Sequence, residues 1–476
     1  MTGGEIGSQE PARTDGRPWR FLQRNLHARK RPNTQDTAAK GFTDFAFTNR
    51  TPPFLCKEVW LGTAMQRNGA VKRAETRDAR MSPISPGLEP RWLPTPTRVV
   101  HLTPALFGDA GVFGGAERYS FELARHMARV VPTTLVTFGD RPRRFSTPEG
   151  LRVCVLGPAW HVRGQRFNPF HTGLVRVVAG AAVIHCHQPH TLAAEIAALL
   201  ARGFGRRVVA SDLGGGGWGL SSRFDTDAWF HAHLHISEYS RAVAGHGGRP
   251  RAAVIYGGVD IDLFTPDPEV PREPLVVFVG RLLPHKGVND LIDALPEGLT
   301  LELIGRPYDE RFGADLRRRA RGKRVVFRHD CDDASLIHAY RRATCVVLPS
   351  VYRDCYGNES RVPELLGQTL IEGMACAAPA ICTAVASMPE VVVDGVTGFV
   401  VPPNDPTTLR ARLGWLRDHP EQVRQMGEAG RRRVLERFTW SAVVARCLKA
   451  YSASLPASAC GRSDFPLHPL QPGANH

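Results

Sequence analysis

Short apolar runs alternate with amphipathic segments from residue 98 onwards, and this pattern continues through most of the chain. Runs rich in Val, Ile and Leu are typical of strands buried on both faces of a parallel sheet. In the first half they fall at 98–102, 133–138, 152–156, 182–186, 207–211, 233–236 and 252–256. Because segments with helical apolar spacing separate the runs, the pattern predicts a doubly wound α/β domain over 96–262.

A second series of apolar runs follows at 275–279, 301–304, 324–327, 345–348 and 380–383. Pro363 is expected to start a helix that continues through Ala375, since proline suits the first helical position. Further helices are expected at 406–418 and 420–436. We therefore predict a second doubly wound domain over 263–438, and such sheets bind ligands at the carboxyl ends of their strands.

The two ends of the chain lack this alternation. Residues 1–95 are rich in Arg, Pro, Gly, Thr and Asn without an apolar period, which predicts a disordered basic extension. Two alternatives stay open for this segment: a translation start placed too far upstream, with Met65 or Met81 as the later start, and a basic arm that contacts anionic lipid. The Pro-rich segment 456–476 is expected to be a disordered tail.

Composition adds a strong positive charge to this picture. The net charge of +15 indicates an anionic partner, such as a nucleotide-sugar, an acidic lipid surface or nucleic acid. Residues 1–95 hold 16 Lys and Arg against 9 Asp and Glu, so +7 of the +15 lies in the extension. Ten irregularly spaced cysteines without a Cys-x-x-Cys pair favour reduced thiols in a cytoplasmic protein. We expect neither a membrane span nor a secretory signal.

Candidate site residues follow the apolar run at 345–348. Glu364 is expected at the start of the helix and Glu372 lies eight positions later, about 12 Å away in helical geometry. Between them the free N–H groups of Leu366, Gly367 and Gln368 suit a phosphate, and Gly367 allows close approach of a ligand. The pattern fits a ligand with a sugar at one end, phosphates in the middle and a ribose at the other. The alternative is a pair of solvated acids.

Four features together resemble family 4, group 1 retaining glycosyltransferases of the GT-B fold. They are the Glu-x7-Glu spacing, PELLGQTLIEGMAC at 363–376, MPEVVVDGVTGFVVPPND at 388–405 and GRLLPHKG at 280–287. The resemblance covers about 98–451 and implies two Rossmann-like domains facing across a cleft, with 439–455 as a crossover helix that returns to the first domain. Ala377 departs from the family's usual glycine, and Leu365-Leu366 replace a commoner aromatic residue.

The resemblance also implies roles for individual residues in the second domain. Glu364 would contact the donor sugar and Glu372 the donor ribose, while Leu366, Gly367 and Gln368 would bind the donor phosphates. Arg281 and Lys286 would stabilise the departing diphosphate, which fits two fixed cations at the carboxyl end of a strand. The alternative for these cations is an exposed surface pair.

Two sites in the first domain complete the implied set. Gly114 and Gly115 of the GGAER stretch would lie near the donor phosphates and the acceptor, although a strand–turn–helix junction requires glycine in any case. His187, at the end of a predicted strand, would lie where sugar and acceptor meet; the alternative is a packed histidine. The alternating His231, His233 and His235 could share a metal ion, but no carboxylate or cysteine completes that set in the sequence.

The expected activity is transfer of a hexose from a nucleotide-diphospho-sugar to a glycan or lipid-linked hydroxyl, with retention of configuration. A role in cell-surface polysaccharide or glycolipid synthesis fits, with peripheral association at the inner face of the membrane. We expect no metal, no cofactor beyond the sugar nucleotide and no nucleic acid partner. Two rival functions remain: a sugar-nucleotide epimerase of the same architecture, and a basic protein that binds nucleic acid or membrane.

Overall fold

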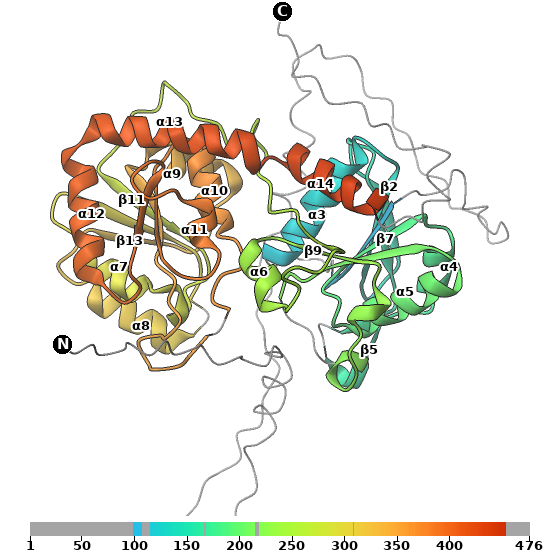
Figure 1. The fold of residues 1–476 in the computed structure, drawn as a ribbon. Coiled ribbons are helices and arrows are strands. Elements are labelled where there is room, and N and C mark those ends of the chain that lie inside the picture. The colour runs from blue at the N-terminus through green and yellow to red at the C-terminus, as the bar shows by residue number, and fades with distance from the viewer. Residues whose placement is uncertain are drawn as a thin grey trace, which may run out of the picture.

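Two sheets, one mostly and one wholly parallel, organise the chain, each in its own Rossmann-like domain (Figure 1). The computed structural model describes residues 99–106, 115–165, 168–214, 219–307, 309–360 and 362–453. The extension predicted over 1–95 and the tail over 456–476 lie outside the described residues. The domain boundaries predicted at 262 and 438 stay predictions, while the strands of the two sheets lie within 99–254 and 275–401.

The sheet of the first domain has eight strands in the order β10-β9-β8-β7-β1-β2-β4-β3. Their bounds are β1 Val99–Leu106, β2 Thr133–Phe138, β3 Arg143–Ser146, β4 Arg152–Leu156, β7 Val183–His187, β8 Arg207–Ser211, β9 Ala232–His235 and β10 Ala252–Val254. All seven predicted strands are confirmed. Only β3 runs antiparallel, and the sequence pattern missed it because all four of its residues are exposed and form no apolar run.

The helices of this domain connect the strands and cover the sheet. They are α3 Gly115–Ala128, α4 Leu174–Ala179, α5 Leu192–Gly203 and α6 Glu238–Val243. A small hairpin, β5 Trp160–His161 with β6 Pro169–Phe170, lies apart from the main sheet. The strand order reverses between β1 and β7, because β2 follows β1 on one side and β8 to β10 follow β7 on the other. Ligands of doubly wound sheets bind at such a reversal.

The sheet of the second domain has six parallel strands in the order β13-β12-β11-β14-β15-β16. Their bounds are β11 Leu275–Val279, β12 Thr300–Ile304, β13 Val325–Arg328, β14 Cys345–Leu348, β15 Ala380–Thr383 and β16 Gly398–Val401. Its helices are α7 Val288–Ala294, α8 Glu310–Arg319, α9 Asp333–Arg342, α10 Gln368–Ala375, α11 Met388–Val391, α12 Pro406–Asp418 and α13 Pro420–Arg437. Here the order reverses between β11 and β14, which places the equivalent ligand-binding edge after Val279 and Leu348.

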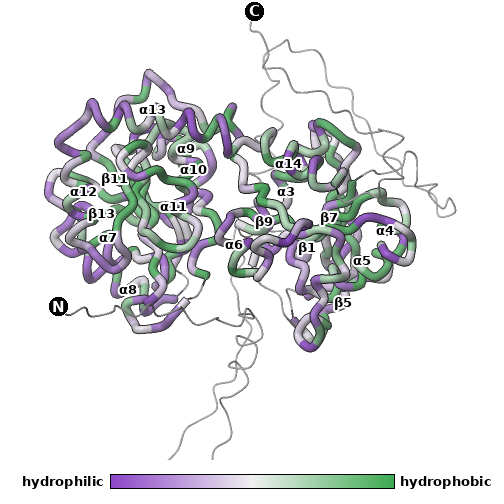
Figure 2. Tube along the Cα trace, in the orientation of Figure 1, coloured by the Kyte–Doolittle hydropathy of each residue, from purple (hydrophilic) through white to green (hydrophobic). Residues whose placement is uncertain are grey.

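A last helix, α14 Trp440–Ala453, leaves the second domain and packs on α3 of the first (Figure 1). Its buried residues include Trp440, Val443 and Tyr451. They join one apolar cluster that runs through the core of the second domain and under α3. Figure 2 colours the chain by hydropathy: apolar residues concentrate in the strands inside each domain, and polar residues lie mostly on the helices outside.

Candidate functional site

The edge of the second sheet where the strand order reverses holds an ion pair. Lys286 lies in the short helix η5 (Pro284–Lys286) that follows β11, and its Nζ donates to Oε2 of Glu364 over 2.6 Å. Both side chains are largely buried, at 15% and 16% exposed. Burial acts to raise the pKa of Glu364, but the charge of Lys286 and backbone N–H donors outweigh it, so this pKa lies below its usual value. Glu364 is therefore an anion at neutral pH.

The helix after Glu364 begins later than the sequence predicted. α10 starts at Gln368 and not at Pro363, so the prediction of its start is wrong by five residues. Gly367 precedes it in a left-handed conformation, with φ of 81°, and its N–H donates to Oε1 of Glu364 over 3.4 Å. A left-handed residue cannot continue a right-handed helix, so Glu364 lies in a loop. Leu366, 4% exposed, packs into the core.

Glu372 lies on α10 and is only 6% exposed. The hydroxyl of Tyr340 donates to its Oε2 over 3.1 Å. Burial raises the pKa of Glu372, and the attraction of Arg118 and the Tyr340 hydrogen bond only partly oppose this. Arg118 comes from α3 of the first domain and lies 3.4 Å from Asp333 of α9, so Glu372 lies where the two domains meet.

The junction between the domains contacts the start of α10. Nε2 of Gln368 donates to the carbonyl oxygen of Gly258 over 2.9 Å, and its buried Oε1 has no partner among the described residues. A side chain at Gly257 would collide with Leu366 and Gln368. Neither Gly257 nor Gly258 was given a site role from the sequence. Gly258 requires glycine because an added Cβ would collide with the backbone of Trp440, whereas at Gly257 it would meet only the ends of two side chains. No local pattern signals either contact.

Arg281 follows β11 with an exposed side chain. No hydrogen bond or ion pair joins its guanidinium to another residue in the described part of the chain. His285 lies near by, and burial followed by the charge of Lys286 lowers its pKa, so it is neutral at neutral pH. The structure therefore places Arg281, His285, Lys286 and Glu364 at one end of β11. His285 was missed, although it stands inside the GRLLPHKG motif.

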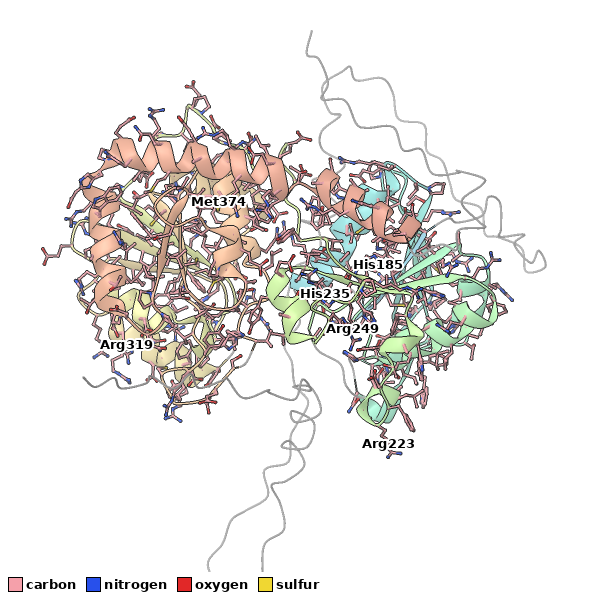
Figure 3. The ribbon with its side chains drawn as sticks, in the orientation of Figure 1. His185, Arg223, His235, Arg249, Arg319 and Met374 are labelled. Atoms are coloured by element: carbon pink, nitrogen blue, oxygen red, sulfur yellow. The ribbon has the colours of Figure 1, made fainter. Side chains whose placement is uncertain are left out.

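Three buried histidines mark the matching edge of the first sheet. His187 ends β7, and its Nε2 lies 3.0 Å from Nδ1 of His101 on β1. His185, labelled in Figure 3, hydrogen-bonds Tyr451 of α14 through Nδ1. Its Nε2 hydrogen-bonds Ser211, and both distances are 2.7 Å. Burial lowers the pKa of all three imidazoles, to about 3 for His101, so they are neutral. His101 was missed as a candidate site residue. A histidine inside the apolar run 98–102 was a signal that could have found it, because the run 182–186 also contains a histidine.

The glycine loop is only partly described. Gly114 lies outside the described residues, so its predicted place near the donor stays a prediction. Gly115 is the first residue of α3, and an added Cβ there would meet no atom within 4 Å. Its surroundings in the described residues therefore impose no requirement for glycine.

Two side-chain clusters have the composition of metal sites. One is His101, His185 and His187, with one ligand atom from each within 4.8 Å of the others. The second is Asp227, His233 and His246, at the same spacing. This is not the set suggested from the sequence, because the fold brings Asp227 and His246 to His233, and not His231 or His235. Each cluster contains a hydrogen bond between two of its members, His101 with His187 and His246 with Asp227. Nε2 of His101 and Nδ1 of His187 are buried without a partner among the described residues. Metal independence stays a prediction.

Comparison with known proteins identifies the class to which this site belongs. The family described as "Glycosyltransferase Family 4" matches residues 113–263, and "Glycosyl transferases group 1" matches residues 262–433. A GDP-mannose-dependent alpha-(1-6)-phosphatidylinositol monomannoside mannosyltransferase of Mycolicibacterium smegmatis is 32% identical over 370 residues, 71% of this chain and 87% of that protein. A D-inositol 3-phosphate glycosyltransferase of Segniliparus rotundus is 27% identical over 395 residues, 78% of each protein. The chain belongs to the family 4, group 1 glycosyltransferases.

Solved structures agree with this assignment at the level of the fold. The sucrose-phosphate synthase of Thermosynechococcus elongatus superposes with a TM-score of 0.57 at 20% identity, covering 75% of this chain and 98% of that one. Anabaena HepE, solved with UDP and glucose, gives 0.58 at 18% identity and covers 75% and 100%. The predicted GT-B fold is confirmed. Among the described helices, none combines the length and apolar character that a membrane span requires.

Proposed function

We propose that this glycosyltransferase moves a hexose from a nucleotide-diphospho-sugar to a hydroxyl of a glycan or lipid-linked acceptor, with retention of anomeric configuration. The observation that carries the proposal is the buried Lys286–Glu364 pair beside the exposed Arg281, at the carboxyl edge of the second sheet. A cationic edge of this kind suits a diphosphate, and an ionised carboxylate beside it suits sugar hydroxyls. The Mycolicibacterium relative, a GDP-mannose-dependent mannosyltransferase, supports this donor class.

The donor is proposed to lie along the loop from Glu364 to Gly367 and the first turns of α10. Glu364 accepts hydrogen bonds from the sugar, while Glu372, on the next turns of the helix, accepts them from the ribose. Lys286 and Arg281 contact the diphosphate and stabilise the negative charge that grows as it leaves. Lys286 is already held by Glu364, so little reorganisation accompanies the reaction.

Retention follows if the leaving diphosphate itself removes the proton of the acceptor hydroxyl on the same face of the sugar. No protein nucleophile is then required, and positioning and charge stabilisation supply the catalysis. His187 lies at the reversal point of the first sheet and is proposed to contact the sugar near the acceptor. Its neutral imidazole can take part in hydrogen bonding without adding a charge beside the developing oxocarbenium.

The acceptor is proposed to be a lipid-linked or glycan intermediate of cell-surface synthesis, reached by peripheral association with the inner face of the membrane. The relative that acts on a phosphatidylinositol monomannoside supports an acceptor of this type. The positive net charge of +15 favours an anionic surface.

Two measurements test the proposal. Thermal unfolding of the full chain with GDP-, UDP- and ADP-sugars should show stabilisation by one nucleotide class, because a ligand that binds only the folded state raises its stability. NMR of the product formed with that donor should show the anomeric configuration of the donor. Inversion would overturn the retaining mechanism, and isomerisation of the donor without any acceptor would favour an epimerase. The same assay with EDTA tests the prediction of metal independence.

A further inference from the structure

A cavity of about 220 Å³ lies at the opposite edge of the first sheet from His187. It is lined by Arg202, Gly205, Arg206, Arg207 and His231. Arg207 begins β8 and pairs in register with Val183 at the start of β7, whereas His187 ends β7. At roughly 3.3 Å per residue, the cavity is about 13 Å from His187 along the strands, so it is separate from the reaction edge.

The lining side chains are hydrogen-bond donors, and none is a carboxylate. Arg202 donates from one nitrogen to the carbonyl oxygen of Ala228 over 3.3 Å, and Arg206 from one to that of Ala179 over 3.0 Å. No hydrogen bond or ion pair joins the Arg207 side chain to the described residues. A guanidinium carries five N–H groups, so most of the donors around this cavity are unused.

The protonation of His231 adds one more donor. The backbone N–H of Val208 donates to Nδ1 of His231 over 3.2 Å, so that nitrogen carries a lone pair. The proton of the neutral ring is therefore on Nε2, which makes Nε2 a donor. Every polar side chain that lines the cavity can thus donate to one ligand.

Several arginines lie close together around the cavity, and no carboxylate lines it. Burial, and after it the charge of Arg251, lowers the pKa of Arg207. Burial, Arg207 and Arg202 likewise lower the pKa of His231. Stabilisation of helix ends explains only part of the cluster: it accounts for Arg202, in the last turn of α5, and for Arg206, which reaches the last carbonyl of α4, but not for Arg207 or His231. An anion in the cavity would relieve the repulsion among these groups.

We propose that this cavity binds a phosphate group, as a monoester or diester, at a site separate from that of the sugar nucleotide. Arg207 and the Nε2–H of His231 form its floor, and the exposed Arg202 and Arg206 close over the ligand. Arginine suits this ligand because its planar donors match phosphate oxygens in pairs. The phosphate comes either from a phospholipid headgroup or from a free phosphorylated metabolite. Phe204, 44% exposed between Arg202 and Arg206 in the sequence, provides an apolar neighbour for a lipid.

The test follows the imidazole resonance of His231 in the full chain, assigned by its loss in His231→Gln. Titration with inorganic phosphate, against chloride at equal ionic strength, should move this resonance to saturation. Arg207→Gln should weaken that response about tenfold, since it removes charge-assisted hydrogen bonds. Arg223→Gln is the matched control, because Arg223 is an exposed arginine at the lower tip of the same domain and does not line the cavity (Figure 3).

The His231 resonance reports on the cavity and not on the donor site, so failure of this proposal can be distinguished from failure of the proposed function. Equal weakening by Arg207→Gln and Arg223→Gln, or no saturation at all, would overturn the proposal. Should Arg207→Gln fail to fold by circular dichroism, the exposed Arg202→Gln replaces it. Co-sedimentation with phosphatidylglycerol vesicles but not with phosphatidylcholine vesicles, reduced by Arg207→Gln alone, identifies a headgroup. Saturation by phosphate or glycerol 1-phosphate without vesicle binding identifies a free metabolite.

Discussion

Nζ of Lys286 and Oε2 of Glu364 are 2.6 Å apart, although the two residues lie 78 positions apart in the chain. The pair joins the segment after β11 to the loop before α10, on the two sides of the strand-order reversal. Glu364 also accepts from the N–H of Gly367. One carboxylate thus fixes both the cation and the loop, so the proposed diphosphate and sugar contacts are positioned by a single side chain.

Loss of either proposed diphosphate cation should lower turnover. Lys286→Ala and Arg281→Ala are each expected to reduce kcat by on the order of 100-fold, as the loss of one charge-stabilising donor does. Steady-state kinetics with the donor found by thermal shift would measure the change. Arg424→Ala serves as the control, because Arg424 is exposed and pairs with Glu421 and Glu428 of its own helix. Near-normal kcat in both variants would remove the diphosphate role from this pair.

Glu372 is expected to bind the donor at a cost in the stability of the folded protein. Glu372→Ala should raise the KM for the donor strongly while changing kcat less, since the proposed ribose contact is made in ground state and transition state alike. An unchanged KM would contradict the ribose role. The carboxylate is buried, and the hydrogen bond from Tyr340 and the attraction of Arg118 do not fully offset its loss of water.

The pH dependence of stability gives an independent readout for Glu372. Its pKa in the folded state is raised above 4.5, so the unfolded chain loses this proton first as pH rises. Folding stability therefore falls from about pH 4.5 up to the folded pKa and then stays level. Glu372→Gln removes this loss, so its melting temperature should exceed that of the wild type at pH 8 and approach it near pH 4. A lower melting temperature for Glu372→Gln at pH 8 would argue against this electrostatic cost.

Local sequence patterns predicted the strands well and the contacts between distant segments poorly. The runs 345–348 and 380–383 became β14 and β15 with the same bounds, because continuous apolar character is what a strand buried on both faces requires. The prediction that a helix starts at Pro363 was wrong, because Gly367 has a left-handed conformation and α10 can begin only after it. Proline suits a helix start, and nothing local distinguished that position from a loop proline.

The missed site contacts all join distant segments. Arg118 of the first domain pairs with Asp333 of the second, and its charge also acts on Glu372. Asp227, the first residue of the short 3-10 helix η4 (Asp227–Trp229), lies 2.9 Å from the ring of His246. Such contacts depend on how complete elements pack, and hydrophobic periodicity describes only which face of an element is buried.

Acid should destabilise the first domain through its buried histidines. The pKa of His101 is lowered to about 3 by burial, whereas its ordinary value is 6.5. Between these values the unfolded chain binds a proton that the folded chain does not, so stability falls as pH drops below 6.5, by at most about 1.4 kcal/mol per pH unit for this group. In His101→Gln the melting temperature should fall less steeply from pH 7 to pH 5.

The control for this prediction is a histidine on the surface. His338 on α9 is exposed, so His338→Gln should leave the slope of melting temperature against pH as in the wild type. His101→Gln is expected to melt lower at pH 8, because it loses packing and the contact with His187. Only the slope decides the matter, and an unchanged slope would show that His101 does not remain neutral in the folded state.

Ala377, where the family resemblance leads us to expect glycine, carries backbone strain that a single substitution should relieve. It follows α10 with φ of 58°, a left-handed conformation that costs a residue with a Cβ roughly 1–2 kcal/mol. Glycine avoids this cost but loses more entropy on folding, by roughly 0.5–1 kcal/mol. Ala377→Gly should therefore raise the midpoint of thermal unfolding slightly, whereas Ala429→Gly inside α13 should lower it, at a cost of about 1 kcal/mol. A lower midpoint for Ala377→Gly would show that its side-chain packing outweighs the strain.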